Sequence, residues 1–182
     1  MDANLHHGRQ YRRFCATLAV LLLTTASPVP GQSLLQAENL LFAAPSGFKV
    51  GYQANHDNRL ITEYVPSGET VDDWTQMLTV QIFRGSPLGS AAFLQNVGKR
   101  YMDACPATTA KGIFTGDTNG YVVSMLLLKC PNNPGTGKPE TTAFRIIKGN
   151  DALYSVQRAF RSDPSSTELD AAEQYEIGRA HV

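Results

Sequence analysis

The residues of this chain that suit catalysis or metal binding are few and scattered. Four histidines occur, but His6, His7 and His181 fall in terminal segments that we exclude below, which leaves His56. A zinc site needs several nitrogen or sulfur ligands, and a Ser-His-Asp or Cys-His arrangement would have to use this one imidazole. Because His56 stands among the turn-forming residues 55–58, we expect an exposed loop side chain, no catalytic group, no metal and no cofactor.

The densest acidic cluster comprises Glu63, Glu69, Asp72 and Asp73. Converging carboxylates support general acid–base chemistry or hold a metal ion. Neighbouring carboxylates in a loop mostly point apart into solvent, so the spacing favours a solvated loop. A hydrolase or lyase acting through Glu63 or Asp73 is the alternative, and it predicts that these groups converge in a concave pocket with raised pKa values.

Two further ligand classes find little support. The stretch from Gly135 to Lys138 (GTGK) invites comparison with a phosphate-binding loop, but Asn132 stands where that loop needs glycine and Pro139 where it needs Ser or Thr. Lys and Arg number 16, as do Asp and Glu, so the net charge is zero and no basic field argues for nucleic acid. Hydrophobic residues make up 42% of the chain, as in ordinary globular proteins.

One set of side chains is a candidate for binding. Arg145, Tyr154, Arg158 and Phe160 alternate on two strands that we predict to form the last hairpin. They can line a surface groove for an anionic or peptide partner. Equally, the aromatic rings can pack on a helix while the arginines shield a face of the sheet, and both interpretations stay open.

The two cysteines that lie between the terminal segments are Cys105 and Cys130. An even count in an exported chain argues for a disulfide, which would stabilise the fold by about 3 kcal/mol. A redox pair is the alternative, but the two residues do not form a Cys-x-x-Cys motif.

Both ends need trimming before the fold is considered. Residues 1–31 combine basic residues with a short apolar run at 16–26, and we expect a signal peptide that is cleaved after Gly31, or after Ala26 as the alternative. An anchor helix is disfavoured because the run is too short to span a bilayer. Residues 176–182 resemble a translated sequencing adapter, so we expect a single domain over residues 32–175 that is truncated at its C-terminal end.

Periodicity and turn residues predict the elements of this domain. Residues 47–65 predict a hairpin, and Ser86 with Pro87 predicts the start of a helix over residues 87–103. A second helix begins at Ser166. The remaining strands are predicted at residues 77–83, 112–115, 121–130, 143–148 and 153–161. This order predicts an α+β fold, a single antiparallel sheet with helices packed on one face.

Residues 47–52, 63–70 and 73–83 resemble a family of uncharacterised exported proteobacterial proteins, and the similarity extends to the cysteine pair and to the strand around Tyr154. The resemblance covers most of residues 32–175. It implies export and brings no catalytic residues. The order of elements is also similar to the PsbP/Mog1-like α+β sandwich, which accessory and binding proteins use.

The sequence therefore favours a periplasmic or secreted accessory or binding protein without enzymatic activity. We expect a protein or small-molecule partner in the cell envelope, no nucleic acid, and no membrane span after signal cleavage. The carboxylate-dependent hydrolase or lyase is one alternative. A secreted effector or a subunit of an envelope complex that docks through its C-terminal helix is another.

Overall fold

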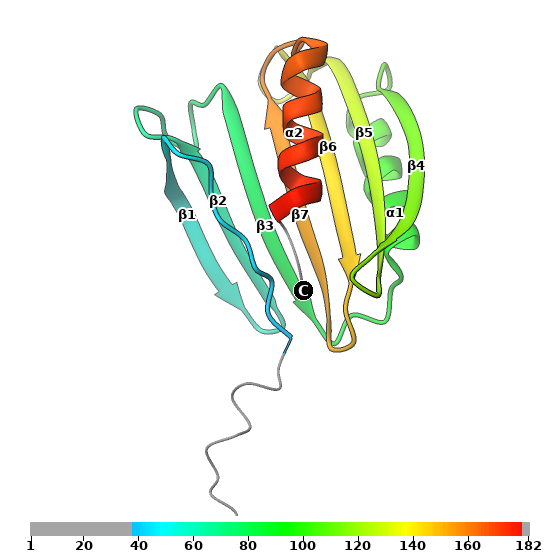
Figure 1. Ribbon diagram of the computed structural model, residues 1–182. Helices are drawn as coiled ribbons and strands as arrows, with labels where there is room; N and C mark the ends of the chain where they lie inside the picture. The colour runs from blue at the N-terminus through cyan, green and yellow to red at the C-terminus, as the bar shows by residue number, and fades with distance from the viewer. Residues whose placement is uncertain (1–37, 180–182) are drawn as a thin grey trace, which may run out of the picture. The chain divides into compact units, whose positions relative to one another are not determined.

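The computed structural model describes residues 38–179, so the predicted signal peptide lies outside the described residues. The elements are β1 (Phe48–His56), β2 (Arg59–Pro66), β3 (Gln76–Arg84), α1 (Ser90–Ala104), β4 (Thr109–Thr118), β5 (Tyr121–Asn133), β6 (Lys138–Lys148), β7 (Ala152–Phe160) and α2 (Ser166–Arg179). The seven strands form one antiparallel sheet in the order β1-β2-β3-β7-β6-β5-β4 (Figure 1). The predicted order of elements is confirmed.

Short turns with the expected chemistry connect the hairpins. Between β4 and β5, Asn119 and Gly120 both have positive φ, at 55° and 82°. This is the backbone of the tight turn that Asn-Gly favours, because it matches the twist of the two strands. Asp57 has a φ of 49° in the turn between β1 and β2. The hairpin predicted over residues 47–65 is therefore confirmed, with β1 and β2 in antiparallel register.

The first helix begins later than the sequence predicts. Gly89, and not Ser86, precedes α1, and the first helical hydrogen bond runs from the Phe93 N–H to the Gly89 carbonyl. The Ser86 carbonyl instead accepts a hydrogen bond of 2.7 Å from the Lys148 Nζ atom at the end of β6. This tertiary contact holds Ser86 outside the helix and overrides the local start signal.

The second helix begins where the sequence predicts. Ser165 and Glu168 form a capping box, in which the carboxylate accepts the Ser165 N–H at 2.8 Å and the Glu168 N–H contacts the Ser165 hydroxyl at 3.3 Å. These hydrogen bonds lower the pKa of Glu168. Ala172 is fully buried, and α2 contacts β6. The helix continues to Arg179, and the artificial origin of residues 176–182 stays a prediction.

The hydrophobic core lies on both faces of the sheet. Leu94 of α1 packs with Leu126 of β5 and Phe144 of β6, whereas Val123 and Ile147 of the same two strands belong to a separate cluster. Alternate side chains of a strand point to opposite faces, so a strand that is apolar on both faces requires cover on both sides. The α+β class with a single antiparallel sheet is confirmed. The structure adds that α1 lies behind the sheet and α2 in front of it in Figure 1.

The predicted pairing of the cysteines is confirmed. Cys105 follows α1 directly and forms a disulfide with Cys130 of β5, with an S–S distance of 2.03 Å and a Cα–Cα distance of 6.1 Å. Both residues are buried. The bridge fixes the C-terminal end of α1 to the sheet.

Candidate functional site

The four side chains singled out for binding lie on one face of β6 and β7. Arg145 of β6 pairs with Val156 of β7. Tyr154 and Arg158 are each two residues from Val156 along β7, so their side chains lie on the same face as that of Arg145. Arg145, Tyr154 and Phe160 are only 1%, 2% and 1% exposed. These three side chains are therefore part of the interior, and a binding role for the set stays a prediction.

Arg158 is held among aromatic rings and an amide. Its guanidinium lies 5.4 Å from the centre of the Phe160 ring and 5.9 Å from that of Phe48, and its Nη2 atom donates to the Gln76 Oε1 atom at 2.8 Å. Cation–π contacts of this kind stabilise an arginine that is partly withdrawn from water. The arrangement ties the C-terminal end of β7 to the start of the neighbouring strand β3.

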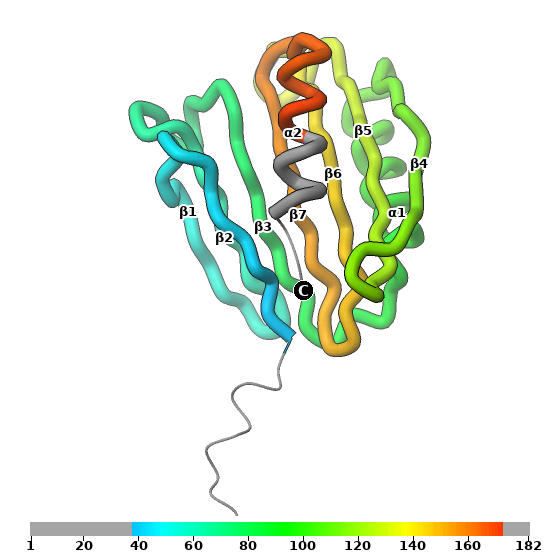
Figure 2. The backbone as a smooth tube through the Cα atoms, viewed as in Figure 1, coloured from blue at the N-terminus to red at the C-terminus, as the bar shows by residue number. Residues whose placement is uncertain are grey.

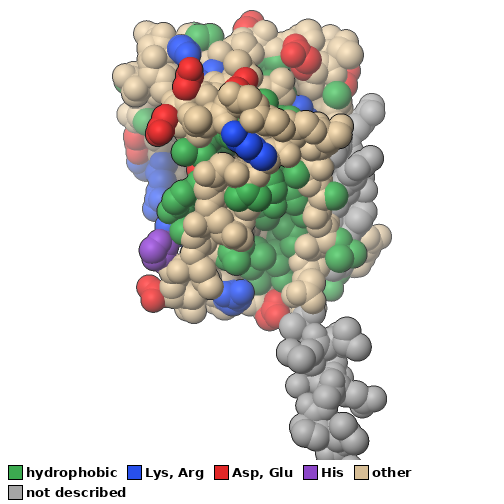
Figure 3. Space-filling view, turned by 90° about the vertical axis from the view of Figure 1, so that its left-hand side faces the viewer, with side chains coloured by type: hydrophobic (Ala, Val, Ile, Leu, Met, Phe, Trp, Pro, Cys, Tyr) green, Lys and Arg blue, Asp and Glu red, His purple; other side chains and the backbone are tan. Residues whose placement is uncertain are grey.

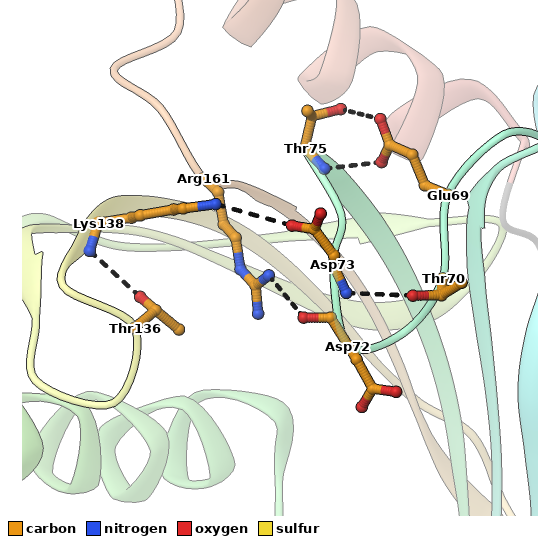
Figure 4. Close-up of polar contacts among 8 residues, drawn as sticks. All are labelled: Glu69, Thr70, Asp72, Asp73, Thr75, Thr136, Lys138 and Arg161. Carbon is orange, nitrogen blue, oxygen red and sulfur yellow. Dashed lines mark hydrogen bonds and ion pairs between the residues drawn. The ribbon is translucent and has the colours of Figure 1, made fainter.

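The acidic loop between β2 and β3 is organised by contacts within the loop and by contacts with Arg161, which follows β7 (Figure 4). The Glu69 carboxylate accepts hydrogen bonds of 2.7 Å from both the backbone N–H and the hydroxyl of Thr75. Arg161 donates to the Asp72 carbonyl at 3.1 Å and stacks 4.0 Å from the centre of the Trp74 ring. The loop contains no helix. The Asp73 N–H donates to the Thr70 hydroxyl at 3.2 Å, and the Thr70 N–H donates to the Asp73 carbonyl at 3.1 Å.

The carboxylates of this region do not gather in one pocket. The Asp73 side chain is 87% exposed and lies 3.7 Å from the Lys138 Nζ atom. Burial raises the pKa of Glu63, which pairs with Thr79 in the middle of β2. Among residues 38–179 no group of three His, Cys, Asp or Glu side chains is placed to hold a metal ion. His56 is exposed at the end of β1.

An apolar depression of about 480 Å³ lies between α1 and β4, and we call it the α1–β4 groove. Leu94, Leu126 and Leu128 contribute to its lining from α1 and β5, and Met102 and Ile113 from α1 and β4. Met102 is 42% exposed and Ile113 is 36% exposed. Exposed apolar side chains that line a depression are typical of binding sites.

Small residues and a strand irregularity create this groove. α1 buries Ser90, Leu94 and Gly98, which recur every four residues on one side of the helix. Gly98 has no side chain, and a Cβ atom there would lie 3.7 Å from the Leu126 Cδ2 atom. The pairing of β4 with β5 shifts between Lys111 and Phe114, at an edge of the sheet. Such bulges bend a strand locally, and β4 remains exposed along nearly all of its length.

Polar contacts fix the helix on either side of the groove. The Ser90 hydroxyl lies 2.9 Å from the Ser124 hydroxyl, and the Tyr101 hydroxyl donates to the Glu140 carboxylate at 2.8 Å. Burial is the main cause of the raised pKa of Tyr101. The ion pair of Lys99 and Asp103 lies at the rim, with both side chains largely exposed. The groove can therefore hold an apolar group beneath a charged rim.

The α1–β4 groove does not follow from the sequence pattern of either element. The signal that would have pointed to the groove is the pair Gly98 and Gly112, which places small residues on two neighbouring elements.

The chain matches no protein-family model and no curated relative. Its structure is similar to that of the Ran-binding protein Mog1p of Saccharomyces cerevisiae, with a TM-score of 0.46 and 13% identity over 75% of this chain and 78% of that chain. It is also similar to cyanobacterial PsbP from Synechocystis, with a TM-score of 0.47 and 16% identity over 78% of this chain and 85% of that chain. A protein of unknown function from Pseudomonas aeruginosa, described as a putative regulator, has a TM-score of 0.39 and 15% identity over 66% of this chain and 78% of that chain. At these identities the function has to be argued from this chain's own residues.

Proposed function

We propose that this protein is an exported accessory protein without enzymatic activity, which binds an apolar group of a partner molecule in the α1–β4 groove. The observation that carries the proposal is the groove itself, an open depression with exposed Met102 and Ile113 on its walls. An open apolar surface of this kind is costly to leave in water unless a ligand or partner covers it.

Two features support export. The disulfide between Cys105 and Cys130 is of a kind that persists in oxidising compartments such as the periplasm. The predicted signal peptide agrees with it, and we propose a periplasmic or secreted location. Within residues 38–179 no helix is long and apolar enough to cross a membrane.

Binding of an apolar probe tests the proposed site. The probe is the fluorescent dye anilinonaphthalene sulfonate, titrated against the folded wild-type chain and two variants of one residue. Gly98→Leu fills the groove, whereas Gly98→Ala adds a methyl group that meets Leu126 at an ordinary contact distance. We expect the wild type and Gly98→Ala to bind the dye equally and Gly98→Leu to bind it at least about tenfold more weakly, a loss of roughly 1.4 kcal/mol.

Equal binding of the dye by all three folded proteins would show that the groove is not the binding site. A screen of hydrolase substrates tests the alternative function. Turnover that is abolished by Glu63→Gln, with the fold retained, would replace the proposal by the carboxylate-dependent enzyme.

A further inference from the structure

The segment of residues 38–46 crosses the sheet and is not one of its seven strands, although Leu41 makes a single β-bridge. We call this segment the strap. It begins beside the turn between β6 and β7 and runs to the start of β1 (Figure 2). Glu38, Leu40 and Phe42 are half-buried, whereas Asn39 and Leu41 are exposed. This alternation is that of an extended segment with one side on the protein.

The Glu38 carboxylate fixes the N-terminal end of the strap to the turn between β6 and β7. The Glu38 carboxylate accepts hydrogen bonds from the Asn150 backbone N–H at 2.8 and 2.9 Å and from the Asp151 backbone N–H at 3.2 Å. The Asn150 side-chain amide donates a further hydrogen bond to it. Successive backbone N–H groups in a turn form a concavity that binds anions. The turn between β6 and β7 is such a concavity, and Glu38 occupies it.

The neighbouring glycine makes room for this carboxylate. A Cβ atom on Gly149 would collide with the Glu38 Oε2 atom and would lie 2.9 Å from the Tyr154 Cε2 atom. The groups that face Glu38 are Tyr121, Asp151 and Tyr154, and Arg84 lines the same pocket of about 400 Å³. The backbone hydrogen bonds hold the pKa of Glu38 below its usual value despite the cost of its partial burial.

The apolar side of the strap covers the face of the sheet opposite α1. Leu40 and Phe42 pack against the cluster that contains Leu78 and Tyr154, and the Phe42 ring lies 5.7 Å from the Tyr64 ring. Leu41 is 65% exposed on the outer side of the strap. Figure 3 shows hydrophobic side chains gathered in the middle of the side of the molecule on which β1 lies. The strap is thus a short peptide held by the Glu38 carboxylate, by two apolar side chains and by the single β-bridge at Leu41.

From this geometry we infer that the strap occupies a peptide-binding site in cis. The site takes an extended segment with the pattern acidic-x-apolar-x-apolar, which residues 38–42 supply, and a partner's segment with the same pattern displaces the strap. The turn at Gly149–Asp151 recognises the acidic residue, and the face formed by Tyr64, Ile82 and Tyr154 receives the apolar ones. This site is separate from the α1–β4 groove, so the failure of one proposal leaves the other standing.

Hydrogen exchange of the folded wild-type chain gives the first test. The strap amides are expected to exchange by local opening, faster than those of β3 and β7, and Glu38→Gln is expected to speed their exchange by about tenfold or more, as the loss of a charged hydrogen bond predicts. Glu69→Gln is the matched control, because Glu69 also accepts a backbone N–H but lies in another loop. Exchange of the strap only through global unfolding would overturn the inference.

Binding in trans gives the second test. A fluorescent peptide of residues 36–44 is titrated against the full chain that carries Glu38→Ala and Phe42→Ala, after the fold of that variant has been checked by circular dichroism. We expect binding to the variant, little binding to the wild type, and about tenfold weaker binding of a peptide that carries Glu38→Gln. No binding to the folded variant would overturn the inference. A wild-type dimer that Glu38→Gln abolishes would also overturn it, because the segment would then serve a second copy of this chain.

Discussion

The α1–β4 groove and the face beneath the strap are two apolar surfaces of one sheet with different cover. The strap fills its face with Leu40 and Phe42 and is fixed by Glu38 at the turn between β6 and β7. The groove has no such cover from the described residues, and Met102 and Ile113 remain exposed on its walls. The comparison teaches that an apolar face of this fold can be covered by a short segment of chain. By the same reasoning, the α1–β4 groove suits apolar side chains of a partner molecule.

Removal of the disulfide is expected to have the largest effect. Cys105→Ala with Cys130→Ala should lower the free energy of unfolding by about 3 kcal/mol, because the cross-link restricts the unfolded chain. Urea denaturation measures this loss. The bridge anchors α1, so dye binding in the groove should weaken while hydrogen exchange of the strap stays unchanged. A strap that loosened as much as the groove would show that the two surfaces are not independent.

Truncation of one apolar side chain on each surface compares the two directly. Phe42→Ala should lower the free energy of unfolding by about 1–2 kcal/mol, because its half-buried ring leaves the contact with Tyr64. Met102→Ala should cost less than about 0.5 kcal/mol, because that side chain is already 42% exposed. Thermal or urea denaturation of the pair is the measurement. Equal losses would contradict the description of one covered and one open surface.

A methyl group added to α1 at Gly98 is expected to stabilise the protein slightly, in contrast to the two losses above. Gly98→Ala should raise the free energy of unfolding by about 0.5–1 kcal/mol, since alanine favours a helix and the added Cβ atom meets Leu126 at 3.7 Å. Urea denaturation again gives the value. A destabilised Gly98→Ala protein would mean that the helix packs more tightly there than the structure shows.

Acid is expected to release the strap with little effect on the groove. The pKa of Glu38 is lowered from 4.5 in the folded state, so its contribution is present above that value and is lost as the pH falls through the lower folded value. Hydrogen exchange of residues 38–46, corrected for the intrinsic effect of pH, should therefore rise below pH 4.5 in the wild type. In Glu38→Gln it should already be fast and should lack this step. A step of equal size in both proteins would exclude Glu38 as its cause.

The sequence predicts the order of the strands, because hairpin turns and hydrophobic periodicity are local signals. It predicts the disulfide because Cys105 and Cys130 are the two cysteines between the terminal segments. The start of α1 is missed because Lys148, distant in sequence, engages the Ser86 carbonyl. Arg145 is expected at a surface, because arginine side chains are mostly exposed in proteins, but in the structure it is buried.

Neither the strap nor the α1–β4 groove follows from the sequence, because both depend on contacts between residues that are far apart along the chain. From the sequence, no helix or strand is predicted over residues 38–46, although Glu38, Leu40 and Phe42 alternate as in a strand. The strap is fixed by the hydrogen bonds between Glu38 and Asn150, which are 112 residues apart, and no local sequence pattern indicates such a contact. The groove depends on the absence of side chains at Gly98 and Gly112, which matters only once α1 and β4 lie side by side.

Hydrogen exchange of the wild-type chain with and without anilinonaphthalene sulfonate tests the central claim most directly, because it locates the bound dye on one surface or the other. The account predicts protection of amides in β4 and in the C-terminal half of α1, with unchanged exchange across residues 38–46. Protection of the strap and not of β4, or protection of neither, would contradict the assignment of the α1–β4 groove as the open binding site.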